Sequence, residues 1–506
     1  MLDTTKAVDL EFPAADVLVI LAAAGNGKTT RLMQELVDAL DTYRPDEIAL
    51  ATFTRKGVAV AMQRALSAVP GITEKDLPYF GTFHKLFFRS LGLTGKNIIE
   101  RKDIEKFNNL LGFNVHLSAA FDNQTEDDKL MQRYDSYRSG NATGVYVESL
   151  CDEDRYTRLI NAYEAFKREN DLLDYHDVLL RYKNEGEPLN VKVALMDEFQ
   201  DSTKLQCECI QKAFGHCERV RIVGDDYQTI FSFAGAVPET LIHLASKYPT
   251  IKLEKSYRLP KAIYNFSRNI TTMITNKVDK DFYPVKTEDG SVDIISDRKL
   301  LAKKIARSIE KSAYKPSSWY LLFRANCFIS SMADILEDAV VPYYTNKGFC
   351  LDKNILTTIS RYYKYRNGLI GSKKAMRRFM EKYNIKSFDD DFTESDIVPS
   401  NKRFMYFDYV EKYGIERLLD MVSEEPCVLL TTTYKVKGGE ADNVAVFMDA
   451  TRIVCENMVS DLDSELRVMY VACTRAKEKL FLVSSEGQYG LDGIIEVAYG
   501  GFYESA

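Results

Sequence analysis

The chain has 506 residues, enough for about three or four domains of ordinary size. With 45% hydrophobic and 28% charged residues, its composition excludes the disordered and collagen-like classes. The 74 acidic residues outnumber the 67 basic ones, and the net charge of −7 argues against a protein that coats nucleic acid by bulk charge. A local basic groove remains open.

The first predicted element is a short buried strand. Residues 17–21 are continuously apolar, and a glycine-containing turn and a helical pattern over 29–40 follow. The apolar run 17–24 is too short to span a bilayer and follows acidic residues, so we expect neither a signal peptide nor a membrane anchor.

Further apolar segments predict a parallel sheet covered by helices on both faces. These segments are 47–52, 191–196 and 219–223. Between them, 91–188 carries long, charged, helix-like segments such as 156–170, which predicts a helical insertion.

A second series of apolar segments predicts a second α/β domain. Its expected strands are 319–323, 427–432, 444–448 and 480–484. The mostly helix-like stretch 355–425 interrupts this series and contains an acidic run at 389–391, which we expect to form a loop. The fold class is therefore α/β, with one insertion in each domain.

The turn after the first strand is the most specific motif in the chain. Residues 22–30, Ala-Ala-Ala-Gly-Asn-Gly-Lys-Thr-Thr, nearly match the phosphate-binding P-loop, with Ala22 in place of the first glycine. Backbone amides at the start of the helix can surround phosphate oxygens, Lys28 can neutralise their charge, and Thr29 can ligate Mg²⁺. An ordinary glycine turn is the alternative, which the flanking strand and helix disfavour. The predicted nucleotide-binding residues are Ala22, Ala23, Ala24, Gly25, Asn26, Gly27, Lys28, Thr29 and Thr30.

Two carboxylates follow the apolar segment at 191–196. We expect Asp197 to hold the hydration shell of Mg²⁺ and Glu198 to orient and deprotonate the attacking water. Acidic pairs at strand ends are usually solvated turns, but an apolar strand that leads into Asp-Glu in a chain with a P-loop favours the catalytic interpretation.

The nine cysteines are mostly single and form no CxxC pair, which predicts the reduced thiols of a cytoplasmic protein. A zinc site at Cys207, Cys209, His216 and Cys217 is an alternative. We do not expect it, because the spacing is not that of a zinc knuckle and the residues continue a helix-like run.

The residues 197–201 resemble the DExxD box of superfamily 1 helicases of the UvrD/Rep/PcrA group, and other boxes of that family appear in the same order. The matching segments are 22–29, 52–56, 81–84, 173–177, 224–236, 257–258, 432–440 and 467–476. They extend over nearly the whole chain. The second insertion looks shorter than in bacterial housekeeping members, so the chain resembles a compact, phage-like member.

This resemblance implies ATP and Mg²⁺ as cofactors and assigns further residues to the nucleotide. Gln228 would sense the γ-phosphate, Tyr257 would stack on adenine, and Glu440 would contact the ribose. Arg258 and Arg475 would be the cationic pair on the γ-phosphate, where a guanidinium fork suits the spread charge of the transferred group. The glutamine of the family's adenine box has no counterpart in 1–16, which leaves selectivity for adenine open.

The resemblance also implies a track for single-stranded DNA, in which aromatic faces stack on bases. The residues at the family's DNA positions are Phe53, Thr54, His84, Phe231, Phe233 and Tyr434. Tyr434 replaces a histidine and Ala234 an arginine of the family, so the track is expected to grip DNA differently. A core position is the alternative for any single phenylalanine.

The segment 361–378 interleaves basic and aromatic residues. At helical spacing, Lys373, Lys374, Arg377 and Arg378 form one strip, which we expect to contact DNA phosphates. A solvated helix face is the alternative.

Together these features predict two RecA-like P-loop domains with parallel sheets, each interrupted by a mainly helical insertion. The expected boundaries are 1–90 and 189–270 for the first domain, 91–188 for its insertion, 271–354 and 426–506 for the second domain, and 355–425 for its insertion.

The predicted function is an ATP-dependent DNA helicase or translocase that travels 3′ to 5′ by family analogy. The alternatives are a translocase that strips proteins from DNA without unwinding, and a nucleotide-switched DNA-binding or loading factor. The expected partners are single-stranded DNA, junctions of single- and double-stranded DNA, and replication or repair proteins. We expect a monomer-capable protein without membrane contact, associated with the nucleoid in the cytoplasm of a bacterial or phage-infected cell.

Overall fold

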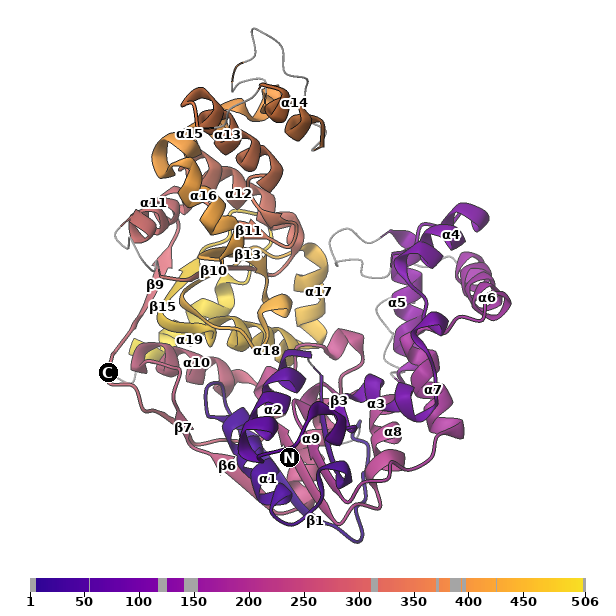
Figure 1. Ribbon diagram of the computed structural model, residues 1–506. Helices are drawn as coiled ribbons and strands as arrows, with labels where there is room; N and C mark the ends of the chain where they lie inside the picture. The colour runs from indigo at the N-terminus through magenta and orange to yellow at the C-terminus, as the bar shows by residue number, and fades with distance from the viewer. Residues whose placement is uncertain are drawn as a thin grey trace. The chain divides into compact units, whose positions relative to one another are not determined.

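A computed structural model describes residues 6–53, 55–116, 125–140, 153–310, 317–369, 373–382, 393, 397–424 and 426–503. The chain forms two compact units (Figure 1). The first contains 1–289, 456–474 and 497–506, and the second contains 290–455 and 475–496. In the part of the chain that the structure describes, no helix is long and apolar enough to cross a membrane.

The first unit is built on a six-stranded sheet in the order β3-β2-β4-β5-β1-β6, and every pair of neighbours is parallel. Its strands are β1 Asp16–Ala22, β2 Ile48–Thr52, β3 Phe80–Thr82, β4 Val193–Met196, β5 Arg219–Gly224 and β6 Thr250–Leu253. Since all strands run the same way, their carboxyl ends meet at one edge of the sheet, where ligands of such folds bind.

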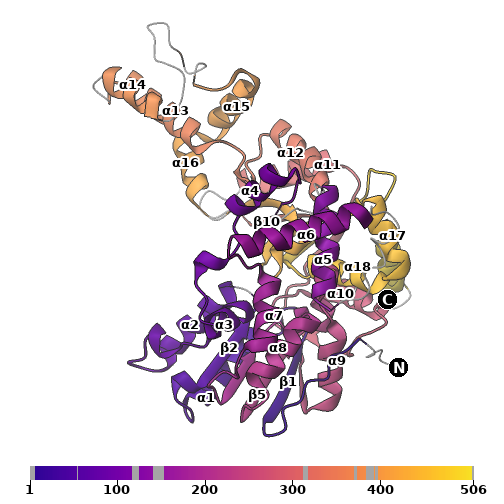
Figure 2. The ribbon, with the colours of Figure 1, turned by 90° about the vertical axis from the view of Figure 1, so that its right-hand side faces the viewer.

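Helices cover both faces of this sheet because the strands are apolar on both sides. On one face, buried residues of α1 (Lys28–Leu40) and α2 (Arg55–Ala68) pack on Ile20, Leu50 and Leu195. On the other, four helices pack on alternate strand residues such as Val19 and Ala194. These are α3 (Phe83–Ser90), α7 (Tyr175–Glu185), α8 (Lys204–Phe214) and α9 (Pro238–Lys247). Figure 2 shows α3, α7 and α8 in front of the strands.

In the range predicted as a helical insertion, 91–188, the structure describes α4 (Arg101–Leu111), α5 (Glu126–Arg138), α6 (Glu153–Glu169) and α7. Its apolar centre surrounds Phe107, which stacks on Phe113 and meets Tyr163 and Phe166 edge to face. α7 joins it to the sheet, because Tyr182 of α7 stacks on Phe87 of α3.

Two further helices complete the first unit. They are α10 (Lys261–Met273) and α18 (Leu462–Cys473), and they pack against each other. A short parallel pair, β7 (Lys255–Ser256) and β8 (Tyr283–Pro284), lies after β6.

The second unit contains a seven-stranded sheet in the order β12-β11-β13-β10-β14-β15-β9. Its strands are β9 Ser291–Ile295, β10 Trp319–Phe323, β11 Tyr344–Thr345, β12 Gly348–Phe349, β13 Val428–Thr432, β14 Ala441–Phe447 and β15 Ala476–Val483. The pairs are parallel except for the edge hairpin β11–β12. The expected α/β class with parallel sheets is confirmed.

Helices of the second unit fall into two groups. α11 (Arg298–Glu310) and α12 (Ile329–Asp338) pack on the sheet, and α17 (Arg452–Ser460) and α19 (Asp492–Tyr503) are each divided between the two units. The second group has its own core around Leu356, Tyr409 and Leu418. It comprises α13 (Lys353–Arg366), α14 (Lys373–Lys382), α15 (Arg403–Tyr413) and α16 (Ile415–Ser423). The acidic run at 389–391 lies outside the described residues.

Candidate functional site

The P-loop connects β1 to α1 at the carboxyl edge of the first sheet. Gly25 and Gly27 have φ values of 76° and 77°, a region that favours glycine. Position 25 also has no room for a side chain, because an added Cβ would stand 2.5 Å from Cβ of Arg258. Ala22, at the position of the usual first glycine, is fully buried at the end of β1.

The segment that follows β6 closes over this loop. The amide of Tyr257 donates to the carbonyl of Gly25 at 2.9 Å, and the hydroxyl of Ser256 donates to the carbonyl of Ala24 at 2.9 Å. Tyr257 itself is 60% exposed, and its ring approaches Gly27 closely enough to lie 3.8 Å from a Cβ built there. The aromatic face is therefore accessible beside the P-loop, where stacking on a base requires it.

α18 supports the loop from another side. The amide of Ala24 donates to Oη of Tyr470 at 3.0 Å, and a guanidinium nitrogen of Arg258 donates to the carbonyl of Thr474 at 3.4 Å. All four residues belong to the first unit. The sequence did not indicate the contact of Tyr470 with the P-loop.

Asp197 and Glu198 lie at the carboxyl end of β4. The amide of Asp197 donates to Ala51 of β2 at 2.9 Å, and its carboxylate accepts the amide of Glu198 at 2.9 Å. Glu198 has φ 55°, an uncommon value for a residue with a side chain, and strained backbone of this kind is concentrated at functional sites.

Gln200 fixes the glutamate and connects it to the next strand. Its side-chain NH₂ donates to the carboxylate of Glu198 at 2.6 Å, and its carbonyl oxygen accepts the amide of Asp225 at 3.0 Å. Gln200 is fully buried. It stands within the DExxD match, but no role was assigned to it from sequence.

Asp225 lies directly after β5 and contacts two residues that are predicted to bind phosphate, Lys28 and Gln228. Nε2 of Gln228 donates to its carboxylate at 2.6 Å, and Nζ of Lys28 lies 3.6 Å from the same oxygen. Burial alone would raise the pKa of Asp225, but the charges of Lys280 and Lys28 hold that pKa below its usual value. Lys28 and Gln228 are thus brought together on one ionised carboxylate.

Lys280 is a buried cation that sequence reasoning missed. Its side chain is fully buried, with Nζ 3.1 Å from Asp225, paired with Asp226, and 3.4 Å from the centre of the Tyr227 ring. Burial would lower its pKa, but Asp226 and Asp225 raise it. The only signal in the sequence is the pair Asp225-Asp226 after a buried strand, because two buried carboxylates need a cation. No motif identifies the residue that supplies this cation.

Oxygen ligands suited to Mg²⁺ are present at the same edge of the sheet. Thr29 stands in the first turn of α1, and Asp197 follows β4. Among the described residues, the hydroxyl of Thr52 at the end of β2 is a buried polar atom without a hydrogen-bond partner. This hard-oxygen donor set fits a hydrated magnesium ion.

Another carboxylate cluster lies in the helical insertion. Oxygens of Glu164, Asp174 and Asp177 are close enough together to hold a metal. Nζ of Lys167 already stands among them at 2.7, 2.9 and 2.6 Å, so a protein cation occupies the place that a metal ion would take.

The three cysteines of the zinc alternative are buried. Cys209 donates its thiol to the carbonyl of Leu179 and Cys217 to that of Val191. Burial raises the pKa of each of these two thiols to about 12 and that of Cys207 further. They therefore remain protonated, as core thiols do.

The predicted DNA residues of the first unit form aromatic pairs. Phe53 meets Phe83 edge to face at 5.3 Å, and Phe231 lies 6.1 Å from Phe233, which is 39% exposed. Phe53 is partly buried and packs against the core of the first unit. The alternative that it is a core residue is therefore correct in part. Thr54 lies outside the described residues.

His84 packs edge to face on Tyr175 at 5.6 Å. Burial, with a smaller contribution from His176, lowers the pKa of His84 to about 4. The imidazole is therefore neutral at physiological pH, and it can stack or form hydrogen bonds without adding charge.

Three predicted residues belong to the second unit. A guanidinium nitrogen of Arg475 donates to the carbonyl of Gly439 at 3.2 Å, which places Arg475 beside the exposed Glu440. The guanidinium of Arg324 lies over the ring of Tyr434, 5.2 Å from the ring centre.

α14 has the amphipathic character expected of the basic strip. Lys373, Lys374, Arg377 and Arg378 are exposed, whereas Met376 on the same helix is fully buried. The four cations thus share the outer side of the helix.

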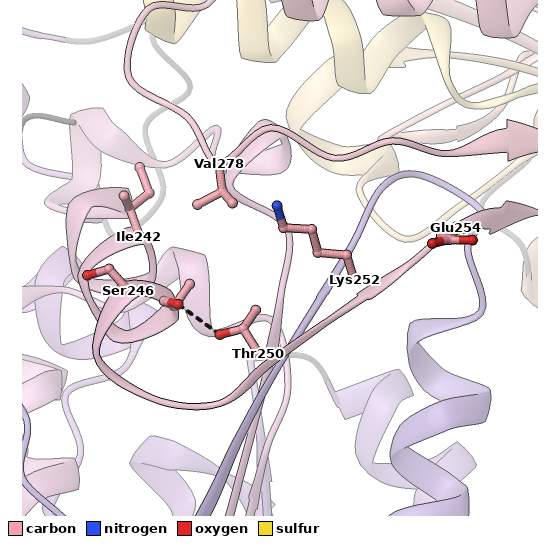
Figure 3. A pocket seen from close by; sticks show the side chains of 7 residues that line it. Ile242, Ser246, Thr250, Lys252, Glu254 and Val278 are labelled. Atoms are coloured by element: carbon pink, nitrogen blue, oxygen red, sulfur yellow. Dashed lines mark hydrogen bonds between the residues drawn. The ribbon is translucent and has the colours of Figure 1, made fainter. Parts of the chain in front are cut away.

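A cavity of about 370 Å³ lies elsewhere on the first unit, between α9 and β6 (Figure 3). It is lined by Ile242, Ala245, Ser246, Thr250, Lys252, Glu254 and Val278. Of the predicted nucleotide and DNA residues, those that the structure describes do not line it.

Comparison with protein families gives two matches. Residues 4–249 match the UvrD/REP helicase N-terminal domain, and residues 354–487 match the UvrD-like helicase C-terminal domain.

Individual relatives are distant in sequence. A probable DNA helicase II homolog of Mycoplasma pneumoniae is 23% identical, over 92% of this chain and 82% of the relative. The ATP-dependent DNA helicase Rep of Escherichia coli is 28% identical over 49% of this chain and 40% of Rep. DNA helicase II of the same organism is 22% identical over 64% of this chain and 49% of the relative. The alignments thus span most of the mycoplasma protein and less than half of the two from Escherichia coli.

Proposed function

The chain belongs to the UvrD/Rep family of DNA helicases, and from this we propose that it uses ATP hydrolysis to move 3′ to 5′ along single-stranded DNA and to separate duplex DNA ahead of it. One observation carries the proposal. Lys28, Gln228, Glu198 and the open face of Tyr257 converge on the carboxyl edge of one parallel sheet.

Each of these residues has a distinct task in phosphoryl transfer to water. Lys28 and the amides at the start of α1 would neutralise and position the β- and γ-phosphates. Glu198, held by Gln200, would accept the proton of the attacking water while the water oxygen bonds to the γ-phosphorus. The bond from that phosphorus to the bridging oxygen would break, and ADP would leave. Gln228 would turn its amide to the γ-phosphate. Thr29 and Asp197 would hold Mg²⁺, which supplies charge neutralisation between the phosphates when it is bound.

Two arginines would complete the site. Arg258 lies against Gly25 of the P-loop, and Arg475 belongs to the second unit. By the family resemblance, we assign both guanidinium groups to the γ-phosphate and Glu440 to the ribose. Supply of Arg475 from the second unit would make hydrolysis sensitive to how the units are arranged, which is what a motor requires.

The DNA track would run over the aromatic pairs of the first unit and Tyr434 of the second. The exposed ring of Phe233 supports this, since stacking of bases on aromatic faces tolerates any sequence. We propose single-stranded DNA and its junctions with duplex as the substrates. A cytoplasmic location, the capacity to work as a monomer, and replication or repair proteins as partners complete the proposal.

A forked-duplex assay tests this function. Duplexes with only a 3′ tail, only a 5′ tail or no tail are incubated with ATP and Mg²⁺, and strand separation is measured beside DNA-stimulated ATP turnover, with Lys28→Ala as the inactive control. We expect separation of the 3′-tailed duplex only. Displacement of streptavidin from a biotinylated 3′ or 5′ end of single-stranded DNA runs in parallel.

The outcomes separate the alternatives. Streptavidin displacement without strand separation would establish the protein-stripping translocase. DNA binding that depends on nucleotide, with turnover that DNA does not stimulate, would establish the switched loading factor. Separation of the 5′-tailed duplex would reverse the assigned direction.

A further inference from the structure

Lys280 lies beneath the proposed phosphate site and belongs to none of the motif segments. Its fully buried ammonium stands between Asp225 and Asp226, and Asp225 in turn contacts Lys28 and Gln228. Asp225 therefore has two kinds of partner: Lys280 below it, away from solvent, and two groups above it that the proposed function directs to the phosphates.

The two lysines differ in how firmly they contact Asp225. Lys28 is 12% exposed and stands 3.6 Å from Asp225, longer than a direct hydrogen bond. The side chain of Lys280 has no exposed surface, and its Nζ is 3.1 Å from the other carboxylate oxygen. Of the two groups above Asp225, Lys28 thus makes the loose contact, whereas Nε2 of Gln228 donates to the same oxygen at 2.6 Å.

Several contacts hold Lys280 independently of Lys28. Its amide donates to Oη of Tyr227 at 3.2 Å, and its ammonium lies over the ring of the same tyrosine. Oη of Tyr227 donates to Val278 at 3.0 Å, and the amide of Val278 donates to Asp226 at 2.8 Å. Nζ of Lys252 in β6 donates to the carbonyl of Asp279, next to Lys280, at 2.8 Å. Figure 3 shows Lys252 beside Val278.

Tyr227 connects this cluster to the P-loop. The rings of Tyr227 and Tyr470 meet edge to face at 5.6 Å, and Oη of Tyr470 accepts the amide of Ala24. A continuous set of contacts thus leads from Lys280 to both ends of the P-loop, through Asp225 to Lys28 and through the two tyrosines to Ala24.

A bound triphosphate would attract both Lys28 and Gln228. If they turned to it, a fully buried Asp225 without Lys280 would keep no cation, and an isolated buried carboxylate is severely unfavourable. Stability alone is a weak reason to keep a buried charge pair, since apolar replacements are often neutral or stabilising. The lysine is explained if it keeps Asp225 paired when Lys28 and Gln228 turn from Asp225 to the phosphates.

We propose that Lys280 is a positioning residue that serves as the permanent counter-ion of Asp225, so that Asp225 can hold Lys28 and Gln228 while the site is empty and release them to the nucleotide phosphates. This inference rests on the proposed ATP-binding function. The ligand class is a nucleoside triphosphate, and the exchange takes place at the side chains of Lys28 and Gln228.

The test compares Lys280→Met with Lys167→Met. Lys167 is an equally buried lysine paired with carboxylates, but it lies in the helical insertion. The affinity of the full chain for a non-hydrolysable ATP analogue with Mg²⁺ is measured by calorimetry at a temperature below the unfolding transition of every variant. In Lys280→Met, Lys28 becomes the one cation that the described residues place beside Asp225, so we expect the affinity to fall by at least about tenfold. Lys167→Met should lower thermal stability and leave the affinity unchanged.

A double variant distinguishes exchange from structural damage. Asp225→Asn combined with Lys280→Met removes both charges and frees Lys28, so affinity should return to within about threefold of wild type. Asp225→Asn alone, which keeps Lys280, should bind the analogue at least as tightly as wild type. It provides the test if Lys280→Met does not fold.

Three results would overturn the inference. They are unchanged affinity in Lys280→Met, failure of the double variant to recover, and weaker binding by Asp225→Asn alone. The proposed function fails separately, if wild type does not bind the analogue or Lys28→Ala binds it as tightly as wild type.

Discussion

Two buried ionic clusters in the first unit are built from the same residue types but differ in their geometry. In the helical insertion, Lys167 meets three carboxylates at 2.6 to 2.9 Å, and Arg138 meets Asp174 at 2.8 Å and Asp177 at 3.1 Å. At the P-loop, Lys28 meets Asp225 only at 3.6 Å, and it is partly exposed.

The difference shows how a site for a ligand differs from a structural cluster. In the insertion, the Leu173–Asp177 segment forms a helix cap, in which Asp174 and Asp177 accept each other's backbone amides while they also bind the two cations. Lys167 contacts all three carboxylates at 2.6 to 2.9 Å, so it makes no loose contact that a ligand could replace. At the P-loop, the contact of Asp225 with Lys28 is long and partly exposed, whereas its contact with Lys280 is shorter and buried.

Loss of Lys28 should have the largest effect. Lys28→Ala removes the charge that neutralises the phosphates, and we expect ATP turnover to fall by about a thousandfold or more while the fold remains intact. Steady-state ATPase assays and thermal unfolding measure the two effects. Normal turnover in this variant would contradict the assignment of the nucleotide site.

Glu198→Gln should separate binding from hydrolysis. The amide keeps the shape of the side chain but cannot accept the proton of water, so turnover should fall by about a hundredfold to ten-thousandfold. Binding of Mg·ATP should persist, giving a stable complex with nucleotide and DNA. Gel-shift and nucleotide-binding assays report the complex, and loss of nucleotide binding would show that Glu198 has another role.

Arg475→Ala should reduce turnover far more than ATP affinity. Its charge would matter most as the transition state develops, so we expect kcat to fall by about a hundredfold with less than about a threefold change in nucleotide affinity. Both quantities are measured for the same preparation. Equal losses would indicate that Arg475 binds ground state and transition state alike.

Lys167→Met in the insertion should lower the stability of the fold and leave ATP turnover unchanged, the opposite of the variants at the nucleotide site. Removal of one partner from a buried ionic cluster leaves carboxylates unpaired, which costs about 3–5 kcal/mol of stability. Chemical denaturation measures this loss, and ATP turnover of the folded fraction in the absence of DNA is the control. A loss of turnover without a loss of stability would mean that the two clusters do not have separate functions.

The strands and the residues of the P-loop could be predicted from the sequence because they depend on local pattern. Continuous apolar runs identified β1, β2, β4 and β5, and Gly25 and Gly27 marked the turn. The sequence missed β3, which is only three residues long, and the edge strand β6, whose central residues Ile251 and Lys252 are exposed. Neither has the apolar run that indicates a buried strand.

Lys280, Gln200 and Tyr470 could not be predicted because their positions depend on tertiary contacts. Lys280 reaches Asp226 across 54 positions of the chain, and Tyr470 reaches Ala24 across 446. A lysine in a polar segment is normally solvated, so nothing local distinguishes this one. The assigned roles of Arg475, Glu440 and the DNA residues remain predictions from family resemblance.

The smallest effect is expected at the surface of α14. Lys373, Lys374, Arg377 and Arg378 are exposed on a helix whose buried side contains Met376 and Met380, so their replacement should not disturb the core. If the strip binds DNA phosphates, changing all four residues to alanine should weaken DNA binding with little dependence on base sequence. For each phosphate that the variant no longer neutralises, the log–log salt dependence should flatten by roughly 0.7 to 0.9.

Three measurements decide whether this strip binds DNA. They are DNA affinity across a salt series for wild type and the quadruple variant, ATP turnover without DNA, which should be unchanged, and thermal unfolding, which should also be unchanged. A matched set of four exposed cations on α11, Lys299, Lys303, Lys304 and Arg307, controls for net charge, because its replacement removes the same number of charges from another helix of the second unit. Equal salt slopes for wild type and the α14 variant would show that the strip is a solvated helix face. Equal flattening in the α11 variant would show that DNA responds to total charge and not to this strip.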